Sequence, residues 1–143
     1  MKNTFSILSI FLLFLSCSHK MTPDSYKKSQ ILFGRGGGFT NLVNEYHLLE
    51  NTKLFYKQNR DSVFTDLGKQ NADTTKLLFA KTRALFADTT LFHQPGNTYY
   101  FIKLQKGNKT QEMIWGNNVA TDEIVQKAKD LYKELMNLVN LNK

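Results

Sequence analysis

Alternation of apolar and polar positions predicts a β-hairpin in the second half of the chain. The clearest alternation runs from Thr98 to Lys106, where every second residue is large and apolar, as in a half-buried strand. The sequence Lys106-Gly107-Asn108-Lys109 has the composition of a hairpin turn, and a return strand is predicted from Thr110 to Trp115.

A second hairpin is predicted in the first half of the chain. Its strands are Glu45–Leu49 and Lys53–Gln58, which flank Glu50-Asn51-Thr52. Asn51 suits this turn because asparagine tolerates a left-handed backbone. Val63 and Phe64 predict a short further extension before Gly68.

Two segments show the 3.6-residue spacing of amphipathic helices. The first runs to about Ala87, with Asn71 or Asp73 as its N-cap. The second begins after Thr121, which is predicted to cap it. The apolar stripe of the second helix is broad enough to pack across a sheet and consists of Ile124, Ala128, Leu131, Leu135 and Leu138. A free amphipathic helix that binds a membrane or a partner is the alternative interpretation.

With a first strand opening at Gln30, the predicted order of elements is β-β-β-α-β-β-α. Consecutive hairpins pair antiparallel, so we expect an α+β fold with a mainly antiparallel sheet. Both helices should cover one face of this sheet. The predicted domain spans residues 30–143 and has the length of a single unit with one core.

The first residues of the chain have the pattern of a secretory signal rather than of a fold element. Lys2 precedes an apolar run from Phe5 to Leu15, which is well short of the ~20 residues that span a bilayer. We therefore predict a signal peptide at residues 1–16. Cys17, directly after it, is the only cysteine in the chain.

The sequence Phe14-Leu15-Ser16-Cys17 resembles a bacterial lipobox, although Phe14 and Leu15 depart from the usual Leu and small residue. The resemblance implies cleavage before Cys17 and lipid attachment to its sulfur, so that acyl chains anchor the protein in a membrane. An unpaired thiol is otherwise unusual in an exported protein. The alternative is a cleaved, soluble secretory protein with an incidental cysteine.

Residues 17–29 are predicted to form the lipid anchor and a flexible tether. Ser18–Ser29 is polar, contains Pro23 and lacks apolar periodicity. Some lipoproteins carry acidic residues after the cysteine as a surface-export signal, and Ser18-His19-Lys20 has none. We therefore expect the protein to remain in the cell envelope, facing the periplasm.

A glycine-rich stretch follows the first predicted strand. Gly34, Gly36, Gly37 and Gly38 indicate a bulge, a close backbone approach or a turn. The pattern Phe-Gly-x-Gly-Gly-Gly-Phe-Thr at residues 33–40 is similar to that of small bacterial lipoproteins without an established activity. The stretch matches neither a Walker loop nor a dinucleotide fingerprint, so a structural role is favoured over nucleotide binding.

The chain is basic, with a net charge of +7 that falls to about +6 when Lys2 is removed with the signal. The cations are scattered rather than clustered, which argues against a nucleic-acid partner. Such a charge favours solubility or attraction to the anionic headgroups of the anchoring membrane.

No pattern in the chain assembles a catalytic or metal-binding site. His19, His47 and His93 lack the spacing of metal ligands, and Ser29 and Ser62 lie outside any nucleophile motif. We therefore expect no cofactor and no metal.

Three residues are candidates for a binding rim: Arg35 and Phe39 beside the glycines, and Trp115 at a strand end. Trp115 is also a natural core residue, which is the favoured interpretation. The sequence predicts a membrane-anchored binding module of the cell envelope. It does not identify the ligand, for which an envelope protein and a glycan are both candidates. A small envelope enzyme or an enzyme inhibitor, with a site built from scattered residues, is the alternative.

Overall fold

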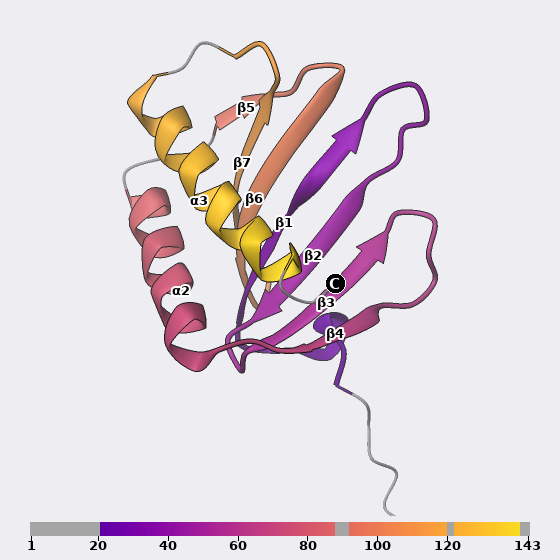
Figure 1. The fold of residues 1–143 in the computed structure, drawn as a ribbon, viewed down its shortest axis with the longest axis vertical. Helices are drawn as coiled ribbons and strands as arrows, with labels where there is room; N and C mark the ends of the chain where they lie inside the picture. The colour runs from indigo at the N-terminus through magenta and orange to yellow at the C-terminus, as the bar shows by residue number, and fades with distance from the viewer. Residues whose placement is uncertain (1–20, 88–91, 120–121, 141–143) are drawn as a thin grey trace, which may run out of the picture.

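A seven-stranded sheet with two helices forms the domain (Figure 1). The computed structural model describes residues 21–87, 92–119 and 122–140. The strands run in the order β4-β3-β2-β1-β6-β7-β5, and all neighbours are antiparallel except β5 and β7. The elements are β1 (Ser29–Gly37), β2 (Asn44–Leu49), β3 (Lys53–Gln58), β4 (Thr65–Lys69), α2 (Ala72–Ala87), β5 (Phe92–Gln94), β6 (Thr98–Lys106), β7 (Lys109–Gly116) and α3 (Glu123–Asn140).

The predicted α+β class with a mainly antiparallel sheet is confirmed. The predicted order of elements is only roughly right, because the sheet has two short strands more. β4 begins just after Val63 and Phe64, where a short extension was expected. β5 pairs with β7 in parallel. It has three residues, and alternation cannot be recognised in so short a segment.

The helices α2 and α3 lie side by side on one face of the sheet (Figure 1). Ile31 and Phe33 of β1 are fully buried beneath them, in one core cluster with residues of both helices. Burial of such a side chain is worth about 1.5–3 kcal/mol. Neither helix in these described parts is long and apolar enough to cross a membrane.

Asparagine and aspartate side chains cap both helices. The Thr74 N–H donates to Asn71 Oδ1 at 3.0 Å, so Asn71 rather than Asp73 is the N-cap of α2. The Val125 N–H donates to Asp122 Oδ1 at 3.0 Å at the start of α3. Thr121, the predicted cap of this helix, lies outside the described residues.

The first hairpin turn differs from the prediction in one residue. Thr52, not Asn51, has the positive φ of 77°. The Asn51 side chain instead accepts a hydrogen bond from the Lys53 N–H at 3.3 Å, which closes an Asx turn. The residue inside that turn then takes the left-handed backbone.

The segment that precedes β1 packs against the sheet, although the sequence predicted a tether there. Pro23–Ser25 forms a short 3-10 helix, and Pro23 is buried. The Gln30 side chain donates to the Pro23 carbonyl oxygen at 3.4 Å. The folded part of the chain therefore includes residues from about Met21, and not only those from residue 30.

The glycines of β1 allow close approach and then a turn, two of the three roles that the sequence left open. A Cβ on Gly34 would overlap the Asn44 carbonyl oxygen, and one on Gly36 would lie 2.6 Å from the Tyr99 hydroxyl. Gly37 has a φ of 91° where the chain leaves the strand. A loop and β2 follow, not the helix that a nucleotide-binding loop would open.

A buried polar chain connects the helix-free face of the sheet to the N-terminal segment. His47, 5% exposed, lies between Glu45 Oε1 at 2.6 Å from Nε2 and Gln30 Oε1 at 3.1 Å from Nδ1. Burial alone would raise the pKa of the Glu45 carboxyl. The hydrogen bond from His47, its charge, and the charges of Lys103 and Lys57 outweigh burial and hold the pKa of Glu45 below its ordinary value of 4.5.

Substitution of Gly34 tests the close approach of β1 and β2. We expect Gly34→Ala to lower the free energy of unfolding by about 1–3 kcal/mol, because the new methyl group meets backbone rather than a movable side chain. Gly96→Ala is the matched control: its Cβ would have no neighbour nearer than 3.4 Å, and it should change stability by less than about 0.5 kcal/mol. Equal urea midpoints for the two variants would contradict this account.

The lowered pKa of Glu45 predicts a pH-dependent contribution to stability. A carboxyl with a folded-state pKa below 4.5 stabilises the fold above that pH, and the contribution disappears as the pH falls through the folded-state value. The stability difference between wild type and Glu45→Gln should therefore shrink between about pH 5 and pH 3, measured by urea unfolding. Glu112→Gln controls for loss of a negative charge on the same face. A pH-independent difference would show that Glu45 acts by packing alone.

Candidate functional site

Two of the three predicted rim residues belong to one cross-strand row on the helix-covered face. Arg35 in β1 pairs with Tyr100 in β6, which pairs with Trp115 in β7. On its other side Arg35 pairs with Asn44 in β2. The third residue, Phe39, is fully exposed in the loop after β1 and is not part of this row.

Trp115 supports the site from below and does not form its rim. The side chain is only 2% exposed, so Trp115 is a core residue that borders the site with little of its surface. Its ring stacks on Tyr100, with centroids 6.1 Å apart, and meets Tyr132 of α3 edge-on at 5.8 Å. Tyr100 and Tyr132 are themselves 5.4 Å apart. These three rings hold α3 at a fixed distance from the sheet.

Two hollows flank this ring cluster and share Tyr100 and Tyr132 as lining residues. We call them the arginine hollow and the lysine hollow, and together the α3 groove. The arginine hollow, about 380 Å³, is lined by Arg35, Asn44, Tyr46, Tyr100, Tyr132, Met136, Val139 and Asn140. The lysine hollow, about 240 Å³, is lined by Tyr100, Trp115, Gly116, Asn117, Gln126, Lys129, Tyr132 and Lys133.

The charged residues that line the α3 groove are all cations: Arg35, Lys129 and Lys133. Lys133 is 3.4 Å from the carboxylate of Asp130. Arg35 is exposed and makes no hydrogen bond or ion pair within the described parts of the chain. The groove therefore has a net positive character, and its guanidinium is available to an incoming group.

Two tyrosines of the groove, Tyr46 and Tyr132, have raised pKa values. Burial, and next the neighbouring Tyr100, raise the pKa of Tyr132 to about 12, against the opposing charge of Arg35. Burial, and next Tyr56, likewise raise the pKa of Tyr46. Both hydroxyls therefore keep their protons.

The Asn44 amide is held in one orientation at the edge of the arginine hollow. Its Oδ1 accepts from the Tyr56 hydroxyl at 2.7 Å and from Gln58 Nε2 at 3.3 Å. Tyr46 packs between Phe33 and Tyr56, with ring centroids 5.4 and 5.1 Å away. The walls of the hollow on β2 and β3 are therefore fixed before any ligand arrives.

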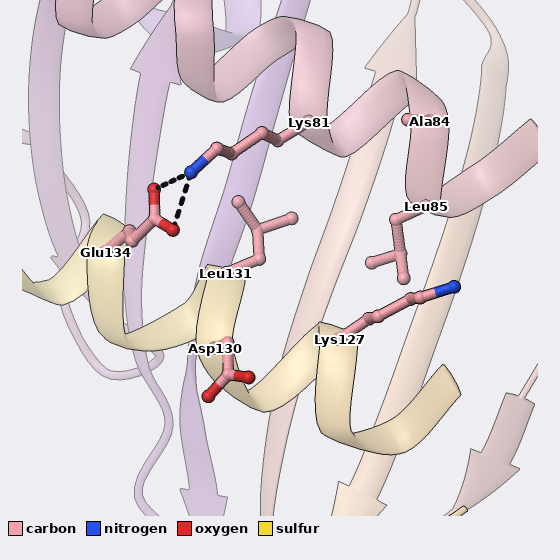
Figure 2. A pocket seen from close by; sticks show the side chains of 7 residues that line it. All are labelled: Lys81, Ala84, Leu85, Lys127, Asp130, Leu131 and Glu134. Carbon is pink, nitrogen blue, oxygen red and sulfur yellow. Dashed lines mark hydrogen bonds and ion pairs between the residues drawn. The ribbon is translucent and has the colours of Figure 1, made fainter. Parts of the chain in front are cut away.

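Figure 2 shows a different hollow, which lies between the two helices. Lys81 of α2 reaches across it and donates to both carboxylate oxygens of Glu134, each at 2.7 Å. Lys127 and Asp130 add one further charge of each sign. Since its charges balance, this hollow is a helix–helix seam and is a weaker candidate than the α3 groove.

The helix-free face has a hollow of about 300 Å³ that contains Glu45, His93, Tyr99 and Lys103. The alternative of a small envelope enzyme requires an acid and a histidine that lie close together in one hollow. The strand register, however, places Glu45 and His93 four strands apart, about 19 Å at ~4.8 Å per strand. Glu45 is also bonded to His47, so the two cannot act on one atom.

His47 and His93, the histidines that the structure describes, are not part of a metal site. In the described segments, no group of three or more His, Cys, Asp or Glu side chains could hold a metal ion. His19 and Cys17 lie outside these segments. His47 uses both ring nitrogens within the polar chain on the helix-free face.

Sequence reasoning identified Arg35 and Trp115 but missed Tyr100, Tyr132 and Asn44. Tyr100 lies within the alternating segment Thr98–Lys106, and nothing local indicates that it pairs with Arg35. The chain matches no known family model and no curated protein sequence. The chemistry of the groove is therefore inferred from its own residues.

Proposed function

We propose that this protein is a lipoprotein of the cell envelope, anchored through Cys17, that binds a ligand in the α3 groove. The arrangement of Arg35 beside Tyr100 and Tyr132 supports the binding role most directly. These side chains come from three separate elements and converge on one hollow with rigid walls. Concave sites that combine aromatic surface with a few placed polar groups are typical of ligand binding.

The position of the groove fits a domain that is anchored at its N-terminus. Ser29 begins β1, and Arg35 lies six residues further along the same strand, about 20 Å at ~3.3 Å per residue. In Figure 1 the indigo start of the described chain lies at the lower end of the sheet. An anchor at Cys17 would therefore present the groove away from the membrane, towards the periplasm or another envelope layer.

The inhibitor alternative has one specific observation in its favour, which is the exposure of Phe39. The loop that carries it is held by hydrogen bonds from Gly38 N to Asn97 O at 2.7 Å and from Asn59 Nδ2 to Asn41 O at 3.0 Å. A fully exposed phenylalanine on a fixed loop is a surface that a partner protein could bind.

Site-specific photo-crosslinking in the intact envelope tests the binding role. A diazirine amino acid in place of Asn140 or Asn117, which line the two hollows, should yield an adduct of the same added mass. The same amino acid in place of Lys76, exposed on α2, should yield none. A further variant carries the diazirine amino acid in place of Phe39, and adducts from that variant alone would favour the inhibitor. Equal yields at all positions would contradict a localised site.

Metabolic labelling tests the anchor. A fatty-acid analogue should mark the wild-type protein and leave Cys17→Ala unmarked, because the thioether to the lipid forms at the Cys17 sulfur. Acyl chains are what would retain the mature protein in the membrane, and the alanine variant cannot receive them at residue 17. The variant should therefore lose its lipid-dependent membrane fraction or remain as an unprocessed precursor. Equal labelling of both proteins would exclude lipid attachment at this residue.

A further inference from the structure

We propose that the arginine hollow binds a carboxylate-bearing sugar unit of an envelope glycan, an inference that rests on the α3 groove being the binding site. Arg35 would pair with the carboxylate. The tyrosine rings and the amides would contact the sugar ring and its hydroxyls.

The requirement for an anion follows from Arg35. It is the only charged residue that lines the arginine hollow, and it has no carboxylate partner within the described residues. The planar guanidinium donates two parallel hydrogen bonds that match a carboxylate. Its charge acts within the hollow, because it opposes the rise in the pKa of both Tyr46 and Tyr132.

The choice of carboxylate over phosphate follows from the surroundings of Arg35. The last turn of α3, with Met136, Val139 and Asn140, lines the same hollow. A helix C-terminus carries a partial negative charge of roughly half a unit, which disfavours a dianion. One guanidinium with no second cation in this hollow therefore suits a single negative charge.

The choice of a sugar follows from the remaining lining. Tyr46, Tyr100 and Tyr132 are half-buried, so each presents ring surface together with a hydroxyl. The raised pKa values of Tyr46 and Tyr132 keep the hydroxyls of those two residues protonated. Asn44, whose oxygen already accepts from Tyr56 and Gln58, adds an NH₂ donor, and Asn140 adds an amide that can both donate and accept. Sugars have apolar ring faces and hydroxyls that both donate and accept hydrogen bonds, so they complement a surface of aromatic rings and polar groups.

The lysine hollow extends the site to a ligand of several units. It lies against the same two tyrosines and adds Lys133, Asn117 and Gln126. An oligosaccharide with a carboxylate on each unit would meet a cation in both hollows. A headgroup of the anchoring membrane is a poor fit, because Arg35 lies about 20 Å along β1 from the N-terminal segment.

Trp115 provides the readout, because it is the only tryptophan of the chain and stacks on Tyr100. The lipidated protein in detergent is titrated with tetragalacturonate, and tryptophan fluorescence is followed. We expect a saturable change that is absent with neutral tetragalactose. Acetate and inorganic phosphate serve as separate arms, and neither should saturate in the concentration range of the tetramer.

Arg35 variants test the assigned contact. Arg35→Gln should weaken binding of the tetramer at least tenfold, and Arg35→Lys should give an intermediate loss because it keeps the charge without the two-pronged donor. Lys76→Gln, which removes a positive charge from the exposed surface of α2, should bind as wild type. Thermal unfolding confirms that each variant is folded, which is expected because Arg35 is exposed.

Three outcomes would overturn the assignment. Equal binding of the neutral tetramer would show that the carboxylate is not required for binding. Saturation by phosphate at the same concentrations would identify a phosphate site. Absence of binding by all probes would exclude acidic sugars of this class. None of these results affects the crosslinking at Asn140 and Asn117, so failure of the ligand class and failure of the proposed binding site remain distinguishable.

Discussion

The whole sheet depends on β1, the central strand, which pairs with a strand on either side. All nine residues of β1 face partners in β6, and six face partners in β2. On the helix-free face, Gly34 leaves room for the Asn44 carbonyl oxygen and Gly36 leaves room for the Tyr99 side chain. On the other face the same strand buries Ile31 and Phe33 in the core. Arg35, next along that face, is consequently held at the centre of the sheet with its register fixed on both sides.

Register also explains why the candidate site is rigid. The pairing of β1 places Arg35 between Asn44 and Tyr100. A shift of one residue would turn Ile31 and Phe33 towards the opposite face, so burial of these two side chains opposes it. The ring contacts of Tyr100 then reach α3 through Tyr132. The groove is thus set by strand pairing and core packing, both of which are in place without a ligand.

Local patterns predicted the elements whose two faces differ in polarity. They failed for segments whose structure depends on contacts with residues distant in the sequence. Alternation located β6 with its bounds, from Thr98 to Lys106, because one of its faces meets the core. β5 has only three residues, which is shorter than any alternation can register. Pro23 was assigned to a tether because its burial depends on Gln30, which belongs to the next element. For the site, Arg35 and Trp115 were recognised as residue types, but their connection through Tyr100 is a property of register that no single segment contains.

The polar groups on the two faces of the sheet differ in whether the fold provides them with partners. On the helix-free face, His47 is enclosed between Glu45 and Gln30, so its polar atoms are satisfied internally and hold the N-terminal segment in place. On the helix-covered face, Arg35 has no such partner within the described residues, although it lies beside Tyr46 and Tyr132, whose hydroxyls stay protonated. A cation that the fold positions but does not neutralise costs less when an external anion pairs with it. This asymmetry is the physical reason to seek the ligand of the protein in the α3 groove, at the end of the sheet away from the N-terminal segment.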